Sequence, residues 1–120
     1  MKAFINRVKY ALQGWLSFFQ REKNGQIQLV IGVLVIVTGF ALSVSITEWM
    51  ILLSCIGMVV SLEMINSALE KLSDHVTPQV HPAIKLVKDI AAGAVLWSAL
   101  VSAIIGLIIF LPKLLRLVFQ

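Results

Sequence analysis

The chain has few of the charged residues that a soluble domain displays on its surface. Only 13% of its 120 residues are charged, whereas 59% are hydrophobic. A soluble domain of this length has too little interior to bury so much apolar surface. The composition therefore excludes an ordinary soluble protein and predicts a membrane protein.

Cysteine is almost absent as well. Cys55 is the single cysteine, which excludes an intrachain disulfide and a metal site built from several thiolates. A signal peptide is not expected, because charges recur near the N-terminus and no small-residue cleavage site follows an apolar core. The sequence also shows no internal repeat, low-complexity tract or Gly/Ser linker. Residues 1–120 are therefore interpreted as one domain, and no nucleic acid partner is expected.

Three segments are long enough to cross a hydrocarbon core about 30 Å thick, which takes about 20 helical residues. They cover residues 27–46, 49–72 and 83–111. Pro78 and Pro82 separate the second segment from the third, and Pro112 is expected to end the third. Only Thr47 and Glu48 link the first two segments, which predicts a tight antiparallel hairpin. The expected fold is an all-α membrane protein.

Residues 3–22 form a separate element with apolar residues at helical spacing. These residues are Phe4, Val8, Leu12, Trp15 and Phe19. The pattern predicts an amphipathic helix lying in the membrane interface, with Trp15 as an anchor. Asn24-Gly25 is expected to turn the chain into the first span.

Basic residues are distributed unequally between the two ends of the expected spans. Lys2, Arg7, Lys9, Arg21, Lys23, Lys71, Lys85 and Lys88 lie at one end, and Lys113 and Arg116 lie at the other. Lysine and arginine accumulate on the cytoplasmic side of membrane proteins. The N-terminus and the loop between the second and third spans are therefore predicted to be cytoplasmic.

The second span carries a polar stripe that lipid would not tolerate. At about 100° per residue, its members fall within an arc of about 100° on one helix face. They are Glu63, Asn66, Ser67, Glu70 and Asp74. A charge at the centre of a membrane helix costs about 2.5–3.5 kcal/mol on insertion scales. The stripe must therefore face protein, water or a substrate, and it is the main candidate for a functional site.

The acidic residues of this region suit phosphate chemistry at a membrane surface. Glu70 is expected near the cytoplasmic surface with Glu22 at a similar level, and Glu63 lies about 10 Å deeper along the helix. Two carboxylates can hold Mg²⁺ together with phosphate oxygens, and Lys88 and Asp89 add a phosphate-binding cation and an acceptor. Glu63, in a medium of low dielectric constant, suits a general base. These parts favour phosphoryl transfer to a hydroxyl group, although the chain has neither a Walker P-loop nor a Gly-rich kinase loop.

The same residues resemble the signature of a known family. The run from Glu63 to Glu70 reads EMINSALE and is followed by His81-Pro82 and then by Lys88-Asp89. This pattern resembles the small prokaryotic membrane lipid kinases, the diacylglycerol kinase family, which includes the undecaprenol kinases. The likeness extends upstream to Tyr10, Gly14 and Glu22 and covers nearly the whole chain. Around Gly93 the sequence is more similar to the undecaprenol kinase branch.

The resemblance implies an enzyme of the bacterial inner membrane that moves the γ-phosphoryl group of Mg²⁺-ATP to undecaprenol or diacylglycerol. It implies a homotrimer whose active sites are shared between neighbouring protomers. It makes Glu63 the base that activates the lipid hydroxyl, with Asn66 supporting the site, and makes Glu22 and Glu70 the metal ligands. The implied ATP contacts are Tyr10, Glu22, Glu70, Gln79, His81, Lys88 and Asp89. The implied lipid contacts are Gly14, Trp15, Glu63 and Ala92.

The sequence departs from the family pattern at two places. Ala3 stands where some members have a basic residue, which Lys2 or Arg7 would replace. Gln79-Val80-His81 stands where Glu-Tyr-His is more usual. One acidic ATP contact thereby becomes an amide, which leaves the preference between ATP and GTP open.

Other functions fit parts of the pattern. A small proton-coupled exporter would use Glu63 alone and leave Glu70, Lys88 and Asp89 without a role. A non-catalytic membrane subunit would use the stripe to bind a partner helix, because polar groups commonly join membrane helices. Nucleotide binding distinguishes the kinase from both.

Overall fold

The computed structural model describes residues 1–77 and 79–120, which form four helices and no strand. The helices are α1 (Lys2–Arg21), α2 (Lys23–Ala41), α3 (Ile46–Val76) and α4 (Pro82–Val118). α2, α3 and α4 are each long and apolar enough to cross a membrane. The predicted all-α fold with three spans is therefore confirmed, while the expected break at Pro78 lies outside the described residues.

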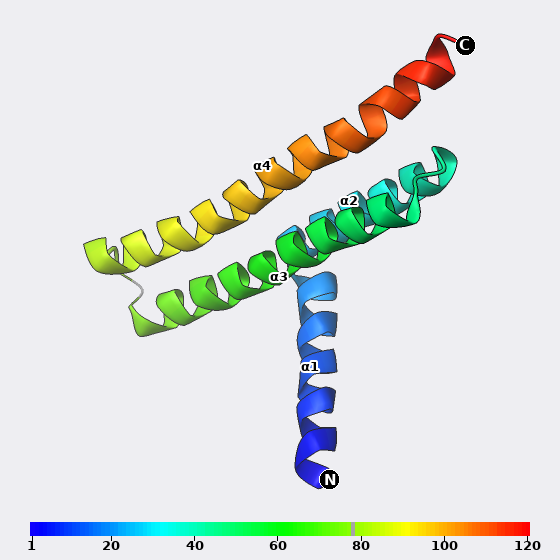
Figure 1. The fold of residues 1–120 in the computed structure, drawn as a ribbon. Helices are drawn as coiled ribbons and strands as arrows, with labels where there is room; N and C mark the ends of the chain where they lie inside the picture. Colours follow the sequence, from blue (N-terminus) through cyan, green and yellow to red (C-terminus); the bar gives the residue numbers. More distant parts are fainter. Residues whose placement is uncertain (78) are drawn as a thin grey trace.

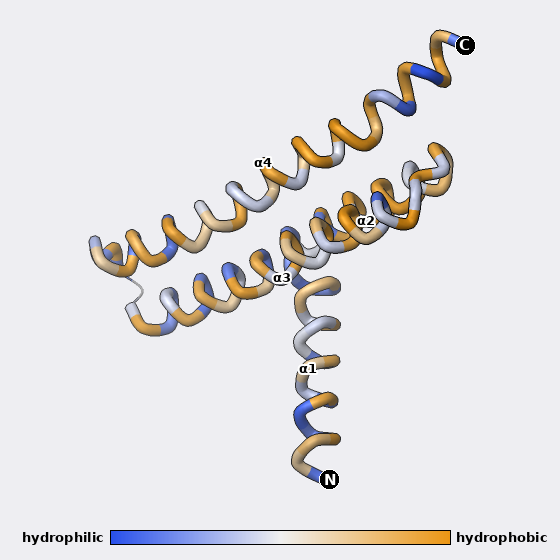
Figure 2. Tube along the Cα trace, in the orientation of Figure 1, coloured by the Kyte–Doolittle hydropathy of each residue, from blue (hydrophilic) through white to orange (hydrophobic). Residues whose placement is uncertain are grey.

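The three long helices run side by side, and α1 leaves them at a steep angle. α2 and α3 form an antiparallel hairpin, and α4 runs back along α3 (Figure 1). Hydrophobic residues dominate the hairpin and most of α4, whereas hydrophilic residues gather on α1 and on the ends of α3 and α4 that meet near the α3–α4 loop (Figure 2). These ends extend beyond the level at which α1 joins the bundle (Figure 1).

The turn between the first two spans lies at residues 42–45, earlier than the expected Thr47-Glu48 link. Ser45 caps α3: the Glu48 N–H donates to Ser45 Oγ at 3.2 Å, and the Ser45 N–H donates to Glu48 Oε1 at 2.9 Å. This reciprocal capping box satisfies two N–H groups that a helix start leaves unpaired. Thr47 and Glu48 therefore belong to the first turn of α3, and the prediction of this link was wrong.

The junction of α1 and α2 also differs from the expected Asn24-Gly25 turn. The helices are separated by Glu22 alone, whose backbone is extended, and Asn24 and Gly25 already belong to α2. Gly25 is buried against α1, and a Cβ atom there would collide with the Phe18 carbonyl group. The glycine therefore serves close helix contact and not a turn conformation.

Pro112 does not end the third span, because α4 continues to Val118. Proline removes one N–H from the helix ladder, and membrane helices tolerate that loss when the surroundings compensate. The segment beyond Pro112 is fixed by Lys113, whose Nζ lies 3.1 Å from Glu48 Oε1. This ion pair joins the last turns of α4 to the first turn of α3.

The Gly25 contact yields a stability prediction. Gly25→Ala should lower the stability of the protein by about 1–3 kcal/mol, because the added methyl group meets backbone and not a movable side chain. Thermal unfolding in detergent would measure the loss. Gly57→Ala is the matched control, since nothing lies within 4 Å of a Cβ at Gly57. An equal loss in both variants would contradict the contact argument.

Candidate active site

The polar stripe of α3 is buried at Glu63, Asn66 and Ser67 and becomes exposed at Asp74. Glu63 is 8% exposed, and Asn66, Ser67 and Ser73 are similarly buried. The Gln28 side chain of α2 lies beside the Glu63 carboxyl group. α2 therefore covers the stripe at Glu63, whose side chain is buried within the bundle.

Two oxygen atoms of the stripe have no partner among the described residues. Asn66 Nδ2 donates to Glu70 Oε1 at 3.2 Å, which joins the two residues one helical turn apart. Glu63 Oε2 and Asn66 Oδ1 are buried without a hydrogen bond. Buried polar atoms are usually paired, so two unpaired oxygens on one helix face indicate a place for a ligand.

Glu22 approaches the same region from the α1–α2 junction. Its carboxylate forms an ion pair with Lys71 of α3, the residue that follows Glu70. The pair places the start of α2 beside the polar end of α3. Glu22 and Glu70 therefore lie at a similar level, and Glu63 lies eight residues from Lys71, about 12 Å along the helix axis.

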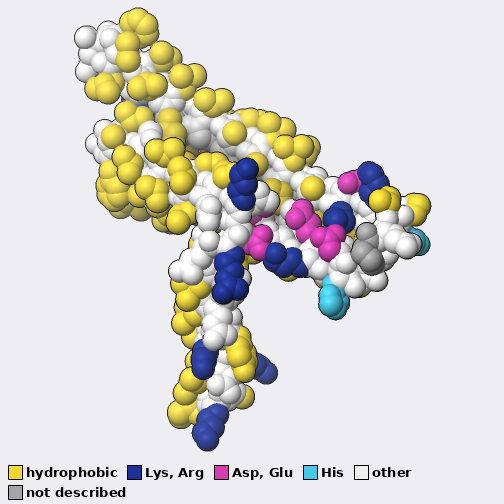
Figure 3. Space-filling model, turned by 180° about the vertical axis from the view of Figure 1, so that it is seen from behind, with side chains coloured by type: hydrophobic (Ala, Val, Ile, Leu, Met, Phe, Trp, Pro, Cys, Tyr) yellow, Lys and Arg dark blue, Asp and Glu magenta, His cyan; other side chains and the backbone are white. Residues whose placement is uncertain are grey.

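Two further ion pairs stand at the meeting ends of α3 and α4. Lys88 Nζ lies 2.7 Å from Asp74 Oδ1, and Lys85 Nζ lies 2.6 Å from Asp89 Oδ2. Glu70 also lies within electrostatic range of Lys88. Figure 3 shows acidic and basic side chains gathered on one face, next to the base of α1. The cluster mixes carboxylates with ammonium groups, an arrangement suited to a metal ion and phosphate groups together.

The two loop residues of the predicted site have local partners. His81 Nδ1 accepts a hydrogen bond from the Ala83 N–H at 3.2 Å and thus caps α4. The Gln79 N–H donates to Thr77 Oγ1 at 3.3 Å. Both side chains belong to exposed residues.

The structure does not bring the predicted α1 residues to the polar stripe. Tyr10 is 65% exposed and Trp15 is 54% exposed, and Gly14 has open space around it. All three lie on the part of α1 that projects away from the bundle (Figure 1). Ala92 lies on an exposed position of α4. One chain therefore unites Glu22, Glu63, Asn66, Glu70, Lys88 and Asp89 at one end of the bundle.

Three residues at the candidate site were not among the predicted site residues. Gln28 lies beside Glu63, Lys71 pairs with Glu22, and Asp74 pairs with Lys88. Gln28 had a usable signal, since it is an amide inside an apolar span, as Asn66 is. Asp74 already belonged to the stripe. Apart from its charge, nothing in the sequence pointed to Lys71, because its partner Glu22 is distant in the sequence.

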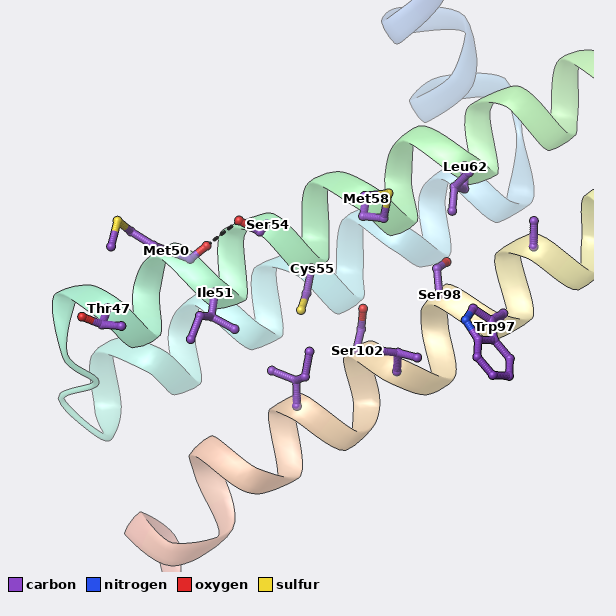
Figure 4. Close-up of a pocket in the computed structure, with 13 residues that line it drawn as sticks. Thr47, Met50, Ile51, Ser54, Cys55, Met58, Leu62, Trp97, Ser98 and Ser102 are labelled. Carbon is purple, nitrogen blue, oxygen red and sulfur yellow. Dashed lines mark hydrogen bonds between the residues drawn. The ribbon is translucent and has the colours of Figure 1, made fainter.

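Two grooves run between the long helices, and Gln28, which lies beside Glu63, lines one of them. An open groove of about 720 Å³ runs between α3 and α4, with Met58, Trp97 and Ser102 among its lining residues (Figure 4). A second groove of about 560 Å³ lies between α2, α3 and α4. Both are mainly apolar, and none of the carboxylates lines them. The candidate site is therefore the polar end of α3 and not a groove in the apolar part.

Comparison with known proteins identifies the family of the chain. A family model described as prokaryotic diacylglycerol kinase matches residues 9–110. The chain belongs to the prokaryotic diacylglycerol kinase family. It is 41% identical over 114 residues to an undecaprenol kinase of Bacillus subtilis, covering 95% of this chain and 93% of that one. A diacylglycerol kinase of Synechocystis is 36% identical over 110 residues, covering 91% of this chain and 63% of that one. A diacylglycerol kinase of Pseudomonas aeruginosa is 30% identical over 94 residues, covering 78% of this chain and 76% of that one.

Membership in this family makes the chain a multi-pass membrane lipid kinase that uses ATP. The predicted resemblance to this family is thereby confirmed. The exporter and the non-catalytic subunit are not favoured.

Asn66 allows a test that separates a catalytic role from simple helix packing. Asn66→Ala removes the donor that holds Glu70, and misplacing a catalytic group by about 1 Å can lower activity about 100-fold. Stability should not fall in parallel, because the substitution also removes the buried, unpaired Asn66 Oδ1. Kinase assays and thermal unfolding of the same preparation would check both. A large loss of stability with a small loss of activity would show that Asn66 only joins helices.

Proposed function

We propose that the protein transfers the γ-phosphoryl group of Mg²⁺-ATP to the hydroxyl of a membrane lipid alcohol, with undecaprenol as the acceptor and diacylglycerol as the alternative. The observation that carries this proposal is the buried Glu63 carboxyl group, which has one oxygen without a partner. The preference for undecaprenol is supported by the Bacillus subtilis undecaprenol kinase, which matches over nearly the full length of both chains.

Glu63 acts as the general base in the proposed reaction. The acceptor hydroxyl donates a hydrogen bond to Glu63 Oε2 and passes its proton to this oxygen as the new bond forms. The lipid oxygen attacks the γ-phosphorus of ATP, and the bond to the β-phosphate oxygen breaks, which releases ADP and the lipid phosphate. A positioned base of this kind contributes about 10²–10⁴-fold to a rate.

The steep angle between α1 and the bundle gives the two substrates separate approaches. We infer that α1 lies in the membrane interface, since Phe4, Val8, Leu12 and Trp15 present exposed apolar side chains among basic residues. Such a helix lies in the membrane plane. Glu63 is then on the membrane side of α1, and Asp74 and Lys88 are on the aqueous side. The lipid hydroxyl arrives from the bilayer, and the nucleotide arrives from water.

Glu22 and Glu70 are the proposed ligands of Mg²⁺. Within the described residues, no group of three or more His, Cys, Asp or Glu side chains is placed to hold a metal. A pair of carboxylates nevertheless fits, because Mg²⁺ is commonly bound by one or two carboxylates plus phosphate oxygens. The ion would neutralise charge on the transferring phosphoryl group. Lys88 would bind phosphate oxygens, and Asp89, His81 and Gln79 would contact the rest of the nucleotide.

The remaining predicted contacts support a homotrimer with shared sites. Tyr10, Gly14 and Trp15 lie far from Glu63 in one chain, on an arm that a neighbouring protomer can meet (Figure 1). We propose that α1 contributes them to an adjacent site. In this arrangement residues 1–120 form one kinase domain of the bacterial inner membrane. The excess of basic residues at the α1 end supports a cytoplasmic N-terminus.

Glu63→Gln tests the proposed base. The amide cannot accept the proton, so phosphate transfer should fall by about 10²–10⁴-fold, measured with radiolabelled ATP and lipid in detergent. Glu48→Gln is the matched control at the opposite membrane end. Its amide oxygen can still accept from the Ser45 N–H, so activity should persist. Transfer at the original rate in Glu63→Gln would remove Glu63 as the base.

A direct comparison of acceptors tests the proposed substrate. With undecaprenol and a diacylglycerol supplied separately at equal mole fraction, kcat/KM should be at least about tenfold higher for undecaprenol. The reverse ratio would assign the chain to diacylglycerol and leave the kinase reaction itself intact.

A further inference from the structure

Lys71 forms an ion pair with Glu22, one of the two carboxylates that the proposed function assigns to the metal. Its ammonium group pairs with Glu22, whose side chain is 25% exposed, while the lysine side chain is 65% exposed. The other proposed ligand, Glu70, is held by the neutral amide of Asn66 at 3.2 Å. Of the two proposed metal carboxylates, Glu22 therefore carries a cation from the protein itself.

An ammonium group and a magnesium ion compete for such a carboxylate. Both are attracted by the same negative charge, and each repels the other at a short distance. A magnesium ion on Glu22 therefore requires the Lys71 ammonium group to move away. The lysine side chain is long and mostly exposed, so it can swing into water without disturbing α3.

The pair also compensates negative charge between the α1–α2 junction and α3. Without a cation, Glu22 and Glu70 would bring two negative charges to the same level of the bundle. Lys71 offsets one of these charges. The α1–α2 junction thereby stays next to α3.

We propose that Lys71 is an internal substitute for the metal, which occupies Glu22 before magnesium binds and sets the concentration of divalent cation that the site requires. This inference rests on the proposed assignment of Glu22 as a metal ligand. It adds Lys71 as a positioning residue, which acts through Glu22 and does not contact the reacting atoms.

Binding of Mn²⁺ alone tests the proposal without any turnover. Free Mn²⁺ is measured by electron paramagnetic resonance in titrations of the purified protein in an uncharged detergent, without nucleotide. Lys71→Met keeps the length of the side chain and removes its charge. It should lower the Kd for Mn²⁺ by about two- to fivefold, the range expected for a partly exposed ion pair. Lys71→Arg keeps the ion pair and should bind Mn²⁺ as the original protein does.

Lys23→Met provides the matched control. Lys23 directly follows Glu22 and is exposed, and it forms no ion pair among the described residues. Lys23→Met therefore removes a positive charge near Glu22, as Lys71→Met does, but it breaks no ion pair. Its Kd should change by less than half as much as that of Lys71→Met.

The outcomes separate this inference from the proposed function. Equal Kd values for Lys71→Met and Lys23→Met, or for Lys71→Met and the original protein, would overturn the role of Lys71 and leave the metal site in place. Mn²⁺ binding that Glu22→Gln does not weaken would overturn both, because Glu22 would then not be a metal ligand.

Discussion

The structure depends on covering a row of polar groups on a helix that is otherwise largely apolar. Asn66 and Glu63 are buried in a helix with apolar residues on its other faces, and leaving them in hydrocarbon would cost several kcal/mol each. The first turns of α2 supply the cover, with Gln28 beside Glu63. Gly25 allows α2 to pack closely against α1, because a Cβ atom there would collide with the Phe18 carbonyl group. The first turns of α2 thus contact α1 at Gly25 and α3 at Gln28.

At the aqueous end the acids are balanced by lysines. Glu22, Asp74 and Asp89 each pair with a lysine. The first two pairs connect α3 to the α1–α2 junction and to α4, and the third lies within α4. Pairs this exposed contribute little stability individually, about 0–1 kcal/mol. In the proposed site they compensate charge locally where a nucleotide with several negative charges would bind. Glu63, in contrast, forms no ion pair among the described residues, as the proposed role of base requires.

Hydropathy and spacing predicted the coarse fold and the position of the stripe, because both follow from local properties of the chain. The three spans needed only runs of apolar residues, and the stripe needed only the helical period. The boundaries failed where a specific contact decided them. Ser45 and Glu48 cap α3 through two side-chain bonds, and Lys113 fixes the segment after Pro112. Neither contact has a signature in hydropathy. Lys71 was missed for the same reason, since its partner is 49 positions away in the sequence.

α3 and α4 are both longer than one crossing of a membrane requires. α3 has 31 residues and α4 has 37, whereas about 20 residues cross the hydrocarbon core. In the proposed arrangement the surplus carries Asp74 and Lys88 into water and leaves Glu63 near the level of α1. The proposed base would there reach a hydroxyl that stays with its lipid, while the phosphate donor stays in water. In the proposed homotrimer, the α1 of a neighbouring protomer would cover the nucleotide on the side where α1 of the same chain points away.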